Sequence, residues 1–153
     1  MVFTTSDSLV SSQRARSSDT ELTEPIWMDN ETNRLTDRII GAAIDVHREL
    51  GPGLLEAAYE RALAHEFVLR RLPFEEQRLC AISYKDLLIE NAYRLDFLVD
   101  HRVVVEIKAV DALLPVHEAQ VLTYLRFSAC RIGLLFNFRS AFLTKHGLRR
   151  LAL

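Results

Sequence analysis

The sequence LDFLVDHRVVVEIK at residues 95–108 contains two apolar runs separated by a polar turn. The first run ends at Val99. The second, residues 103–109, is short and rich in β-branched side chains, which favours a strand over a helix. The polar residues 100–102 provide the turn between them. The stretch therefore predicts two neighbouring antiparallel strands, of which the second is central in a sheet.

Three charged side chains interrupt these strands. Successive side chains alternate between the two faces of a strand, so Glu106 and Lys108 share a face with Val104. Asp96 lies in the preceding run, and a tight turn between antiparallel strands can bring its carboxylate beside that of Glu106. Burying such charges is costly unless they have partners or a metal ion.

This group of charges has two interpretations. In the first, repulsion between the carboxylates of Asp96 and Glu106 favours a divalent cation between them, and hard oxygen ligands favour Mg²⁺ or Mn²⁺ over zinc. Lys108 then holds the attacking water or stabilises the charge that develops on a phosphate. In the second, the three residues form an exposed ion-pair cluster on the solvent side of a half-buried sheet. The spacing alone leaves both open.

Two helices are predicted before this stretch. Apolar residues at spacings of three and four predict a helix over residues 35–50, and Gly51-Pro52-Gly53 ends it. A second helix follows from about residue 54 to residue 70. Its expected buried side contains Leu55, Ala58, Leu63 and Phe67.

The remaining elements are mostly strands. Residues 74–84 and 87–99 predict a hairpin that turns at Lys85-Asp86. Pro115 suits the first turn of a third helix that runs to about residue 128, and residues 132–138 predict a further apolar strand. The end of the chain is expected to be irregular or a short edge strand. This order predicts an α/β fold, a mixed central β-sheet flanked by helices.

The first 33 residues differ from the rest, because they are rich in Ser and Thr and lack a helical or strand period. We expect a disordered or dispensable tail here, followed by a single domain over residues 34–153. Met28 stands just before the periodicity begins and is a candidate start, with residues 1–27 a translated leader or a flexible extension.

Composition excludes several classes of protein. Two cysteines are too few for a disulfide scaffold, and no apolar block resembles a signal peptide or a membrane span, so a cytoplasmic location is expected. No Gly-rich phosphate loop, GxSxG, HExxH or CxxC motif occurs. The net charge is −2, yet residues 119–153 contain six basic and no acidic residues. These basic residues either contact nucleic acid or pair with acids in the middle of the chain.

Several motifs in order resemble a known family of nucleases. Asp96 followed by Glu106-Ile107-Lys108 resembles the D-(x)n-ExK signature of the PD-(D/E)xK nuclease superfamily, with Leu95 in the place of its proline. The segment GLLEAAY at residues 53–59 carries the motif that names the GxxExxY protein family, which is placed in that superfamily. The resemblance begins at about residue 35 and includes VHRELGPG (46–53), YRLD (93–96), EIKAV (106–110) and PVHEAQ (115–120).

The resemblance implies a restriction-endonuclease-like core of order α-β-β-β-α-β with an extra N-terminal helix. It also implies a nuclease that uses Mg²⁺ (or Mn²⁺) to hydrolyse phosphodiester bonds, with DNA as the expected substrate. Asp96, Glu106 and the Ile107 carbonyl would be metal ligands, and Lys108 would assist catalysis. Glu56 would be a third acidic ligand or bind a water on the metal, although by itself it reads as a helix-surface glutamate.

Other residues would position the site or the substrate. Gln120 and Tyr124 reproduce the QxxxY helix motif of the exonuclease-like branch, although the pair is unremarkable on any amphipathic helix. Tyr59 is expected to pack or to orient Glu56. His117 is expected either to form a hydrogen bond at the start of its helix or to contact the substrate.

A second function remains open at this stage. The same fold also serves as a catalytically inactive module that binds nucleic acid or protein. The intact set of Asp96, Glu106 and Lys108 favours the enzyme, whereas the near-neutral charge and the acidic middle of the chain favour the module. A domain of this size is expected to need a protein partner or a second copy to hold a duplex.

Overall fold

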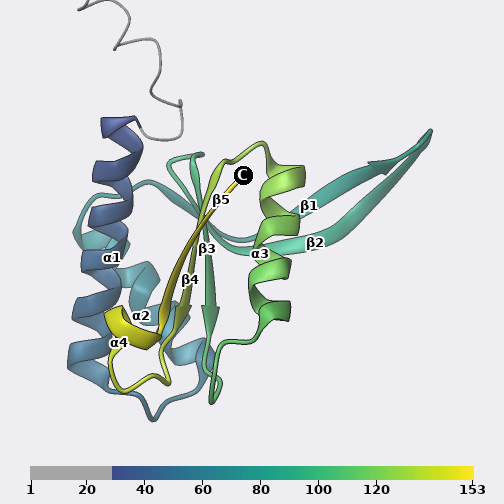
Figure 1. The fold of residues 1–153 in the computed structure, drawn as a ribbon. Helices are drawn as coiled ribbons and strands as arrows, with labels where there is room; N and C mark the ends of the chain where they lie inside the picture. The colour runs from purple at the N-terminus through teal and green to yellow at the C-terminus, as the bar shows by residue number, and fades with distance from the viewer. Residues whose placement is uncertain (1–28) are drawn as a thin grey trace, which may run out of the picture.

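The computed structural model describes residues 29–153, which form a five-stranded mixed sheet with helices on both faces (Figure 1). Along the chain the elements are α1 (Asn30–Leu50), α2 (Glu56–Leu69), β1 (Phe74–Tyr84), β2 (Leu87–Val99), β3 (Val103–Lys108), α3 (Pro115–Ser128), β4 (Ile132–Asn137), α4 (Leu143–His146) and β5 (Leu148–Ala152). The strands lie in the order β1-β2-β3-β4-β5; β3 and β4 are parallel, and the other neighbours are antiparallel. The predicted α/β fold is confirmed.

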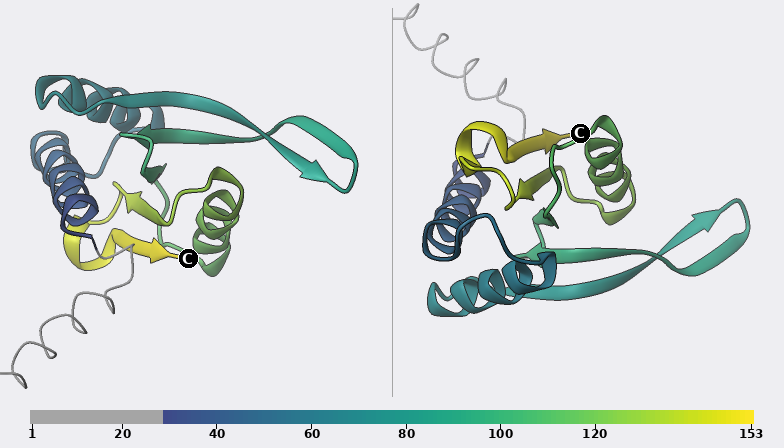
Figure 2. Two further views of the ribbon diagram at one scale, coloured as in Figure 1. Left: turned by 90° about the horizontal axis from the view of Figure 1, so that it is seen from above. Right: turned by 90° about the horizontal axis from the view of Figure 1, so that it is seen from below.

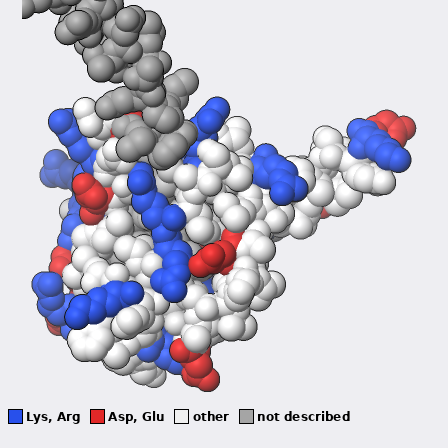
Figure 3. Space-filling view, viewed as in Figure 1, with Lys and Arg blue, Asp and Glu red and all other residues white. Residues whose placement is uncertain are grey.

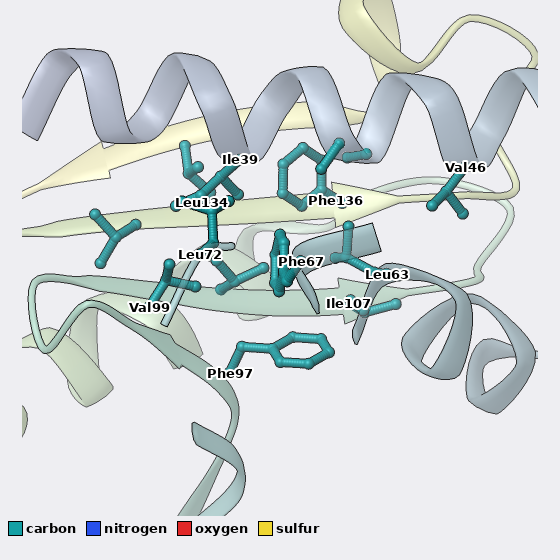
Figure 4. Close-up of a cluster of buried hydrophobic side chains, with 14 of the residues drawn as sticks. Ile39, Val46, Leu63, Phe67, Leu72, Phe97, Val99, Ile107, Leu134 and Phe136 are labelled. Atoms are coloured by element: carbon teal, nitrogen blue, oxygen red, sulfur yellow. The ribbon is translucent and has the colours of Figure 1, made fainter. Parts of the chain in front are cut away.

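The strand β3 separates two apolar clusters, as the alternation of its side chains predicts. Val103, Val105 and Ile107 pack in the larger cluster with residues of α1 and α2, part of which is drawn in Figure 4. Val104 packs in the smaller cluster with Val121 and other residues of α3. The face that carries Val104 therefore also carries Glu106 and Lys108, and α3 covers it.

The ends of α1 follow from local hydrogen bonds. The Asp29 side chain accepts a hydrogen bond from the backbone N–H of Thr32, and at the other end the N–H of Gly51 donates to the His47 carbonyl. Gly51 has φ +70°, a conformation that favours glycine. The helix begins at Asn30, earlier than the apolar pattern indicates, because its first turn is polar.

One predicted core residue is wrong. Leu55 is 78% exposed, because it is the N-cap of α2 and its extended backbone does not follow the apolar side of the helix. Ala58 is only half-buried. Tyr59, Leu63 and Phe67 form the buried side of α2.

The hairpin of β1 and β2 extends well beyond the body of the molecule (Figure 2). We call residues 78–95 the arm. It turns at Lys85-Asp86 as predicted, and the register shifts between Cys80 and Ile82, which marks a β-bulge. Several large apolar side chains on the arm are exposed, namely Leu79, Tyr84, Leu87, Leu88 and Ile89.

The end of the chain adds one short element that the sequence pattern did not predict. The four-residue helix α4 precedes β5, which pairs with β4 at the edge of the sheet. Among residues 29–153, no helix is both long and apolar enough to cross a membrane. Most of the predicted tail lies outside the described residues, so the division into a tail and a domain stays a prediction.

The close approach of α3 to the sheet depends on Gly133 in β4. A Cβ atom at this position would lie 2.6 Å from Cγ1 of Val121, which is fully buried. We therefore expect Gly133→Ala to lower the free energy of unfolding by about 1–3 kcal/mol, the usual cost of overpacking a core. Urea denaturation measures the change. Gly53→Ala is the matched control, because a Cβ at Gly53 meets no atom within 4 Å; equal effects of the two substitutions would contradict this packing argument.

Candidate active site

The candidate site lies where β2 and β3 separate. The ladder between them runs from Val99 opposite Val103 to Phe97 opposite Val105 and ends there. The next residue of β2, Asp96, uses its side chain instead, and its Oδ2 accepts a hydrogen bond of 2.9 Å from the N–H of Ile107. At this fork in the sheet, the Asp96 carboxylate accepts a hydrogen bond from β3 of the kind that a backbone carbonyl accepts within the ladder.

The fork opens into a cavity of about 370 Å³ between α2, the arm and α3. Six residues of the cavity lining were predicted from the sequence: Glu56, Asp96, Glu106, Lys108, Gln120 and Tyr124. Four others come from the arm: Leu79, Asn91, Tyr93 and Arg94. Residues far apart in the sequence therefore meet around the two carboxylates.

Among the charged residues of 29–153, Glu106 is the most deeply buried, with 4% of its surface exposed. Its Oε1 lies 3.5 Å from the Nζ of Lys108, while Oε2 has no hydrogen-bond partner. In residues 29–153 this is the only fully buried side-chain oxygen or nitrogen without one. Burial, together with the negative charge of Asp96, raises the pKa of Glu106 to about 8, against the smaller opposing effect of Lys108.

Asp96 lies in a similar environment. Burial raises its pKa above the ordinary value, the hydrogen bond from Ile107 lowers it, and the charge of Glu56 raises it. The side-chain amide of Gln77 donates to Oδ1 of Asp96 at 3.4 Å and also to the carboxylate of Glu60 on α2. Asp96 is thus held from β1 and β3 at once.

Gln120 and Tyr124 line the opposite wall on α3. The Gln120 amide donates a hydrogen bond of 2.7 Å to the Tyr124 hydroxyl. Burial, followed by the nearby charge of Glu106, raises the pKa of Tyr124, so the hydroxyl keeps its proton at neutral pH. The Tyr124 ring stacks on Tyr93 of the arm, with centroids 5.0 Å apart and planes at 16°. This contact joins the two walls of the cavity.

Comparison with known proteins identifies the family. A sequence model of the PD-(D/E)XK nuclease superfamily matches residues 33–151. The chain belongs to this superfamily. No curated protein and no solved structure matched it. Membership of the superfamily implies a nucleic-acid substrate, and its nucleases typically use divalent metal ions.

The residues of the cavity fit a divalent cation of the kind that PD-(D/E)XK nucleases use. The Oε2 atom of Glu106 has no hydrogen-bond partner within the protein, so it is available as a ligand for a cation. No group of three or more His, Cys, Asp and Glu side chains in residues 29–153 is placed to hold a metal ion. Mg²⁺ does not require one, because it is usually bound by one or two carboxylates and completes its shell with waters and substrate phosphates.

The buried carboxyl groups predict how stability depends on pH without metal. Folding raises the pKa of Glu106 from 4.5 to about 8, so the folded state retains a proton that the unfolded state releases. In EDTA, stability should therefore fall as the pH rises through this window. Glu106→Gln should flatten the decline and gain about 1–3 kcal/mol at pH 8, because it removes the negative charge that burial and Asp96 disfavour.

Melting temperatures at a series of pH values in EDTA test this. Glu118→Gln on α3 is the control, because Glu118 forms an ion pair with Arg149 outside the cavity. A wild-type protein whose stability does not fall between about pH 5 and pH 8 would show that Glu106 ionises normally in the fold.

Two predicted positioning residues lie outside the cavity lining. Tyr59 is fully buried and stacks on Phe138 at 4.7 Å; its hydroxyl donates to the Gly51 carbonyl and accepts from the N–H of Leu54. It therefore fixes the loop that leads to Glu56. The Nδ1 of His117 accepts a hydrogen bond from the N–H of Leu114 at the start of α3, which is one of its two expected roles.

The site also contains residues that sequence reasoning missed. Arg94 lines the cavity, and its position two residues before Asp96 in a strand was a signal for it. Gln77 gave no comparable signal. Asn137 is buried, and its side chain binds both the N–H and the carbonyl of Val110, just after Lys108. It holds the chain that follows β3.

Proposed function

We propose that the protein is a Mg²⁺-dependent nuclease of the GxxExxY family that hydrolyses phosphodiester bonds in DNA, with Mn²⁺ as an alternative ion. The observation that carries the proposal is the cavity at the fork, where Asp96, Glu106 and Lys108 meet and one buried carboxylate oxygen lacks a partner. In a purely structural ion pair this oxygen would have a hydrogen-bond partner, whereas in a metal site it is free to bind the cation.

The carboxylates of Asp96 and Glu106, with the Ile107 carbonyl, would hold the cation. Glu56 is exposed at the rim of the cavity, and its charge acts on Asp96, which suits a residue that binds a water on the metal rather than the metal itself. The cation would stabilise charge on the phosphate and lower the pKa of the attacking water. The hydrogen bond from Ile107 fixes the orientation of Asp96 before any ligand arrives.

Lys108 supplies the fixed positive charge of the site. Its side chain is 16% exposed, and its ammonium group lies beside Oε1 of Glu106. The N–H of Phe138 donates to the Lys108 carbonyl at 2.9 Å, so the turn that follows β4 anchors its backbone. In this position the ammonium would orient the attacking water or stabilise the additional negative charge on the phosphate in the transition state.

The wall on α3 would bind the substrate. Because Tyr124 accepts a hydrogen bond from Gln120 and keeps its own proton, its hydroxyl can donate to a phosphate oxygen. The exposed Arg94 can contact a neighbouring phosphate. The resemblance of Gln120 and Tyr124 to the QxxxY motif supports DNA as the substrate.

The proposed catalytic unit is the domain over residues 34–153. Two unpaired cysteines, Cys80 and Cys130, suit a reducing cytoplasm.

An assay on labelled single- and double-stranded DNA and RNA, in Mg²⁺, Mn²⁺ or EDTA, tests the proposal. We expect hydrolysis in either metal and none in EDTA. Binding of nucleic acid without hydrolysis in every metal would contradict it, and would favour a catalytically inactive binding module on the same fold.

A further inference from the structure

A second cavity, of about 390 Å³, lies beside the catalytic one. Its lining includes Arg78, Leu79 and Tyr93 of the arm and Phe127 near the end of α3. Leu79 and Tyr93 also line the catalytic cavity. The two cavities are therefore adjacent along the arm and together form what we call the arm groove, the space between residues 78–95 and α3.

Aromatic rings stand at the junction of the two cavities. One face of Tyr93 is stacked on Tyr124, and Phe127 lies 6.4 Å from Tyr93, centroid to centroid, at 43°. Phe127 is 43% exposed although it is a large apolar side chain. Aromatic side chains that open into a groove are the surfaces on which unpaired bases stack, in a manner that tolerates any base.

Positive charge lies at each cavity of the arm groove. Arg94 lines the catalytic cavity, and Arg78 lines the second one. Arg78 pairs with Glu75 at 3.0 Å, and its side chain is 41% exposed. Farther along the arm, Glu90 is the one further charged residue before the pair Lys85 and Asp86 at the tip, which is seen in Figure 3. Both arginines of the arm therefore lie at the groove.

From these observations we propose that the arm groove binds a single-stranded segment of nucleic acid next to the phosphate that is cleaved, which rests on the proposed nuclease function. Each cavity has the volume of a site for one small ligand, and a nucleotide is a ligand of this size. A base within a duplex is covered on both faces by its neighbours, so Tyr93 and Phe127 can stack only on a base that is unpaired or splayed out. The substrate class is thus single strands, or single-stranded ends and gaps.

Binding in EDTA separates this inference from catalysis. Fluorescence anisotropy would measure the Kd of labelled oligo-dT and oligo-U, each about 12 nucleotides long, and of a duplex of equal length. We expect tighter binding of the single strands. Phe127→Ala should weaken it about fivefold or more, within the roughly 5- to 150-fold range of one lost base–aromatic stack. Arg78→Ala should reduce the salt dependence by about one ion.

Phe142→Ala is the matched control, because Phe142 is also an exposed phenylalanine, at 60%, but lies next to α4 outside the groove. Tyr93→Leu is a further variant, but it also removes the contact with Tyr124 and can lower stability. The effect of Phe127→Ala on the Kd is therefore the decisive measurement. Tighter binding of the duplex, or equal effects of Phe127→Ala and Phe142→Ala, would overturn the inference. If the protein hydrolyses nucleic acid but Phe127→Ala leaves the Kd unchanged, the groove proposal is wrong and the proposed nuclease function stands. If single strands bind tightly but are not hydrolysed, the groove proposal stands and the nuclease function is wrong.

Discussion

Asp96→Asn is expected to abolish the stabilisation of the protein by Mg²⁺. It should also lower the rate of hydrolysis by at least about 10³-fold, more than the loss of one electrostatic contact usually costs. A ligand that binds only the folded state stabilises it by about 2.7 kcal/mol at a concentration of 100 times Kd. For a chain of this length that corresponds to a rise in melting temperature of about 5–10 °C. The variant should lack this rise, because a neutral amide is a poor ligand for Mg²⁺ beside a single remaining carboxylate.

The substitution preserves shape, since an Asn oxygen can still accept the hydrogen bond from Ile107. Without metal, the variant should be at least as stable as the wild type, because it relieves the repulsion between Asp96 and Glu106. Asp111→Asn is the control; Asp111 is almost fully exposed and pairs with Arg139. An unchanged response to Mg²⁺ in both Asp96→Asn and Glu106→Gln would remove the metal site from this protein.

Lys108→Ala is expected to separate catalysis from metal binding. The ammonium group does not ligate a cation, so the rise in melting temperature with Mg²⁺ should remain nearly intact. Hydrolysis should fall by about 10²–10³-fold, the usual effect of losing one preorganised charge in a site that excludes water. Single-turnover kinetics with saturating enzyme would measure the chemical step apart from binding.

Lys108→Arg should restore only part of the activity, because the planar guanidinium cannot take the place of the compact ammonium beside Glu106. Lys145→Ala is the control, since Lys145 lies on α4 over the ring of Phe142. If Lys108→Ala hydrolysed DNA at the wild-type rate, Lys108 would be only the counter-ion of Glu106.

The central strands were predictable because their signals are local. Alternating side chains in residues 103–108 indicate which residues face α3, and the polar turn before Val103 makes β2 and β3 neighbours. These two facts place Asp96 near Glu106 without any tertiary information. The bounds of the hairpin strands were predictable for the same reason, since turn residues mark both ends.

The bulge in the arm was not predictable. If the register of Tyr84 opposite Leu87 continued, Gln77 would lie opposite Arg94. The shift between Cys80 and Ile82 moves it by two residues, so that Gln77 lies level with Asp96 and donates to its carboxylate. A bulge depends on packing and on a local backbone conformation, here φ +52° at Asn91, which no periodicity in the sequence specifies.

Contacts between distant segments were equally hidden. Asn137 binds Val110 across 27 positions of the chain, and its identity as a buried residue comes from the tertiary fold alone. Leu55 shows the opposite case, in which an apolar pattern continues past the start of the helix and predicts burial where the backbone no longer follows it.

The arm also bears on how such a protein can change over evolution. Its tip at Lys85-Asp86 is exposed and contributes to neither apolar cluster. Insertions or deletions there cost little free energy, because loop tips and long loops tolerate changes in length. The Asp96 carboxylate at the fork would keep its position, held by Ile107 and Gln77. A lineage, or a designer, can therefore lengthen or shorten the arm to change which nucleic acids reach the site while the chemistry stays constant.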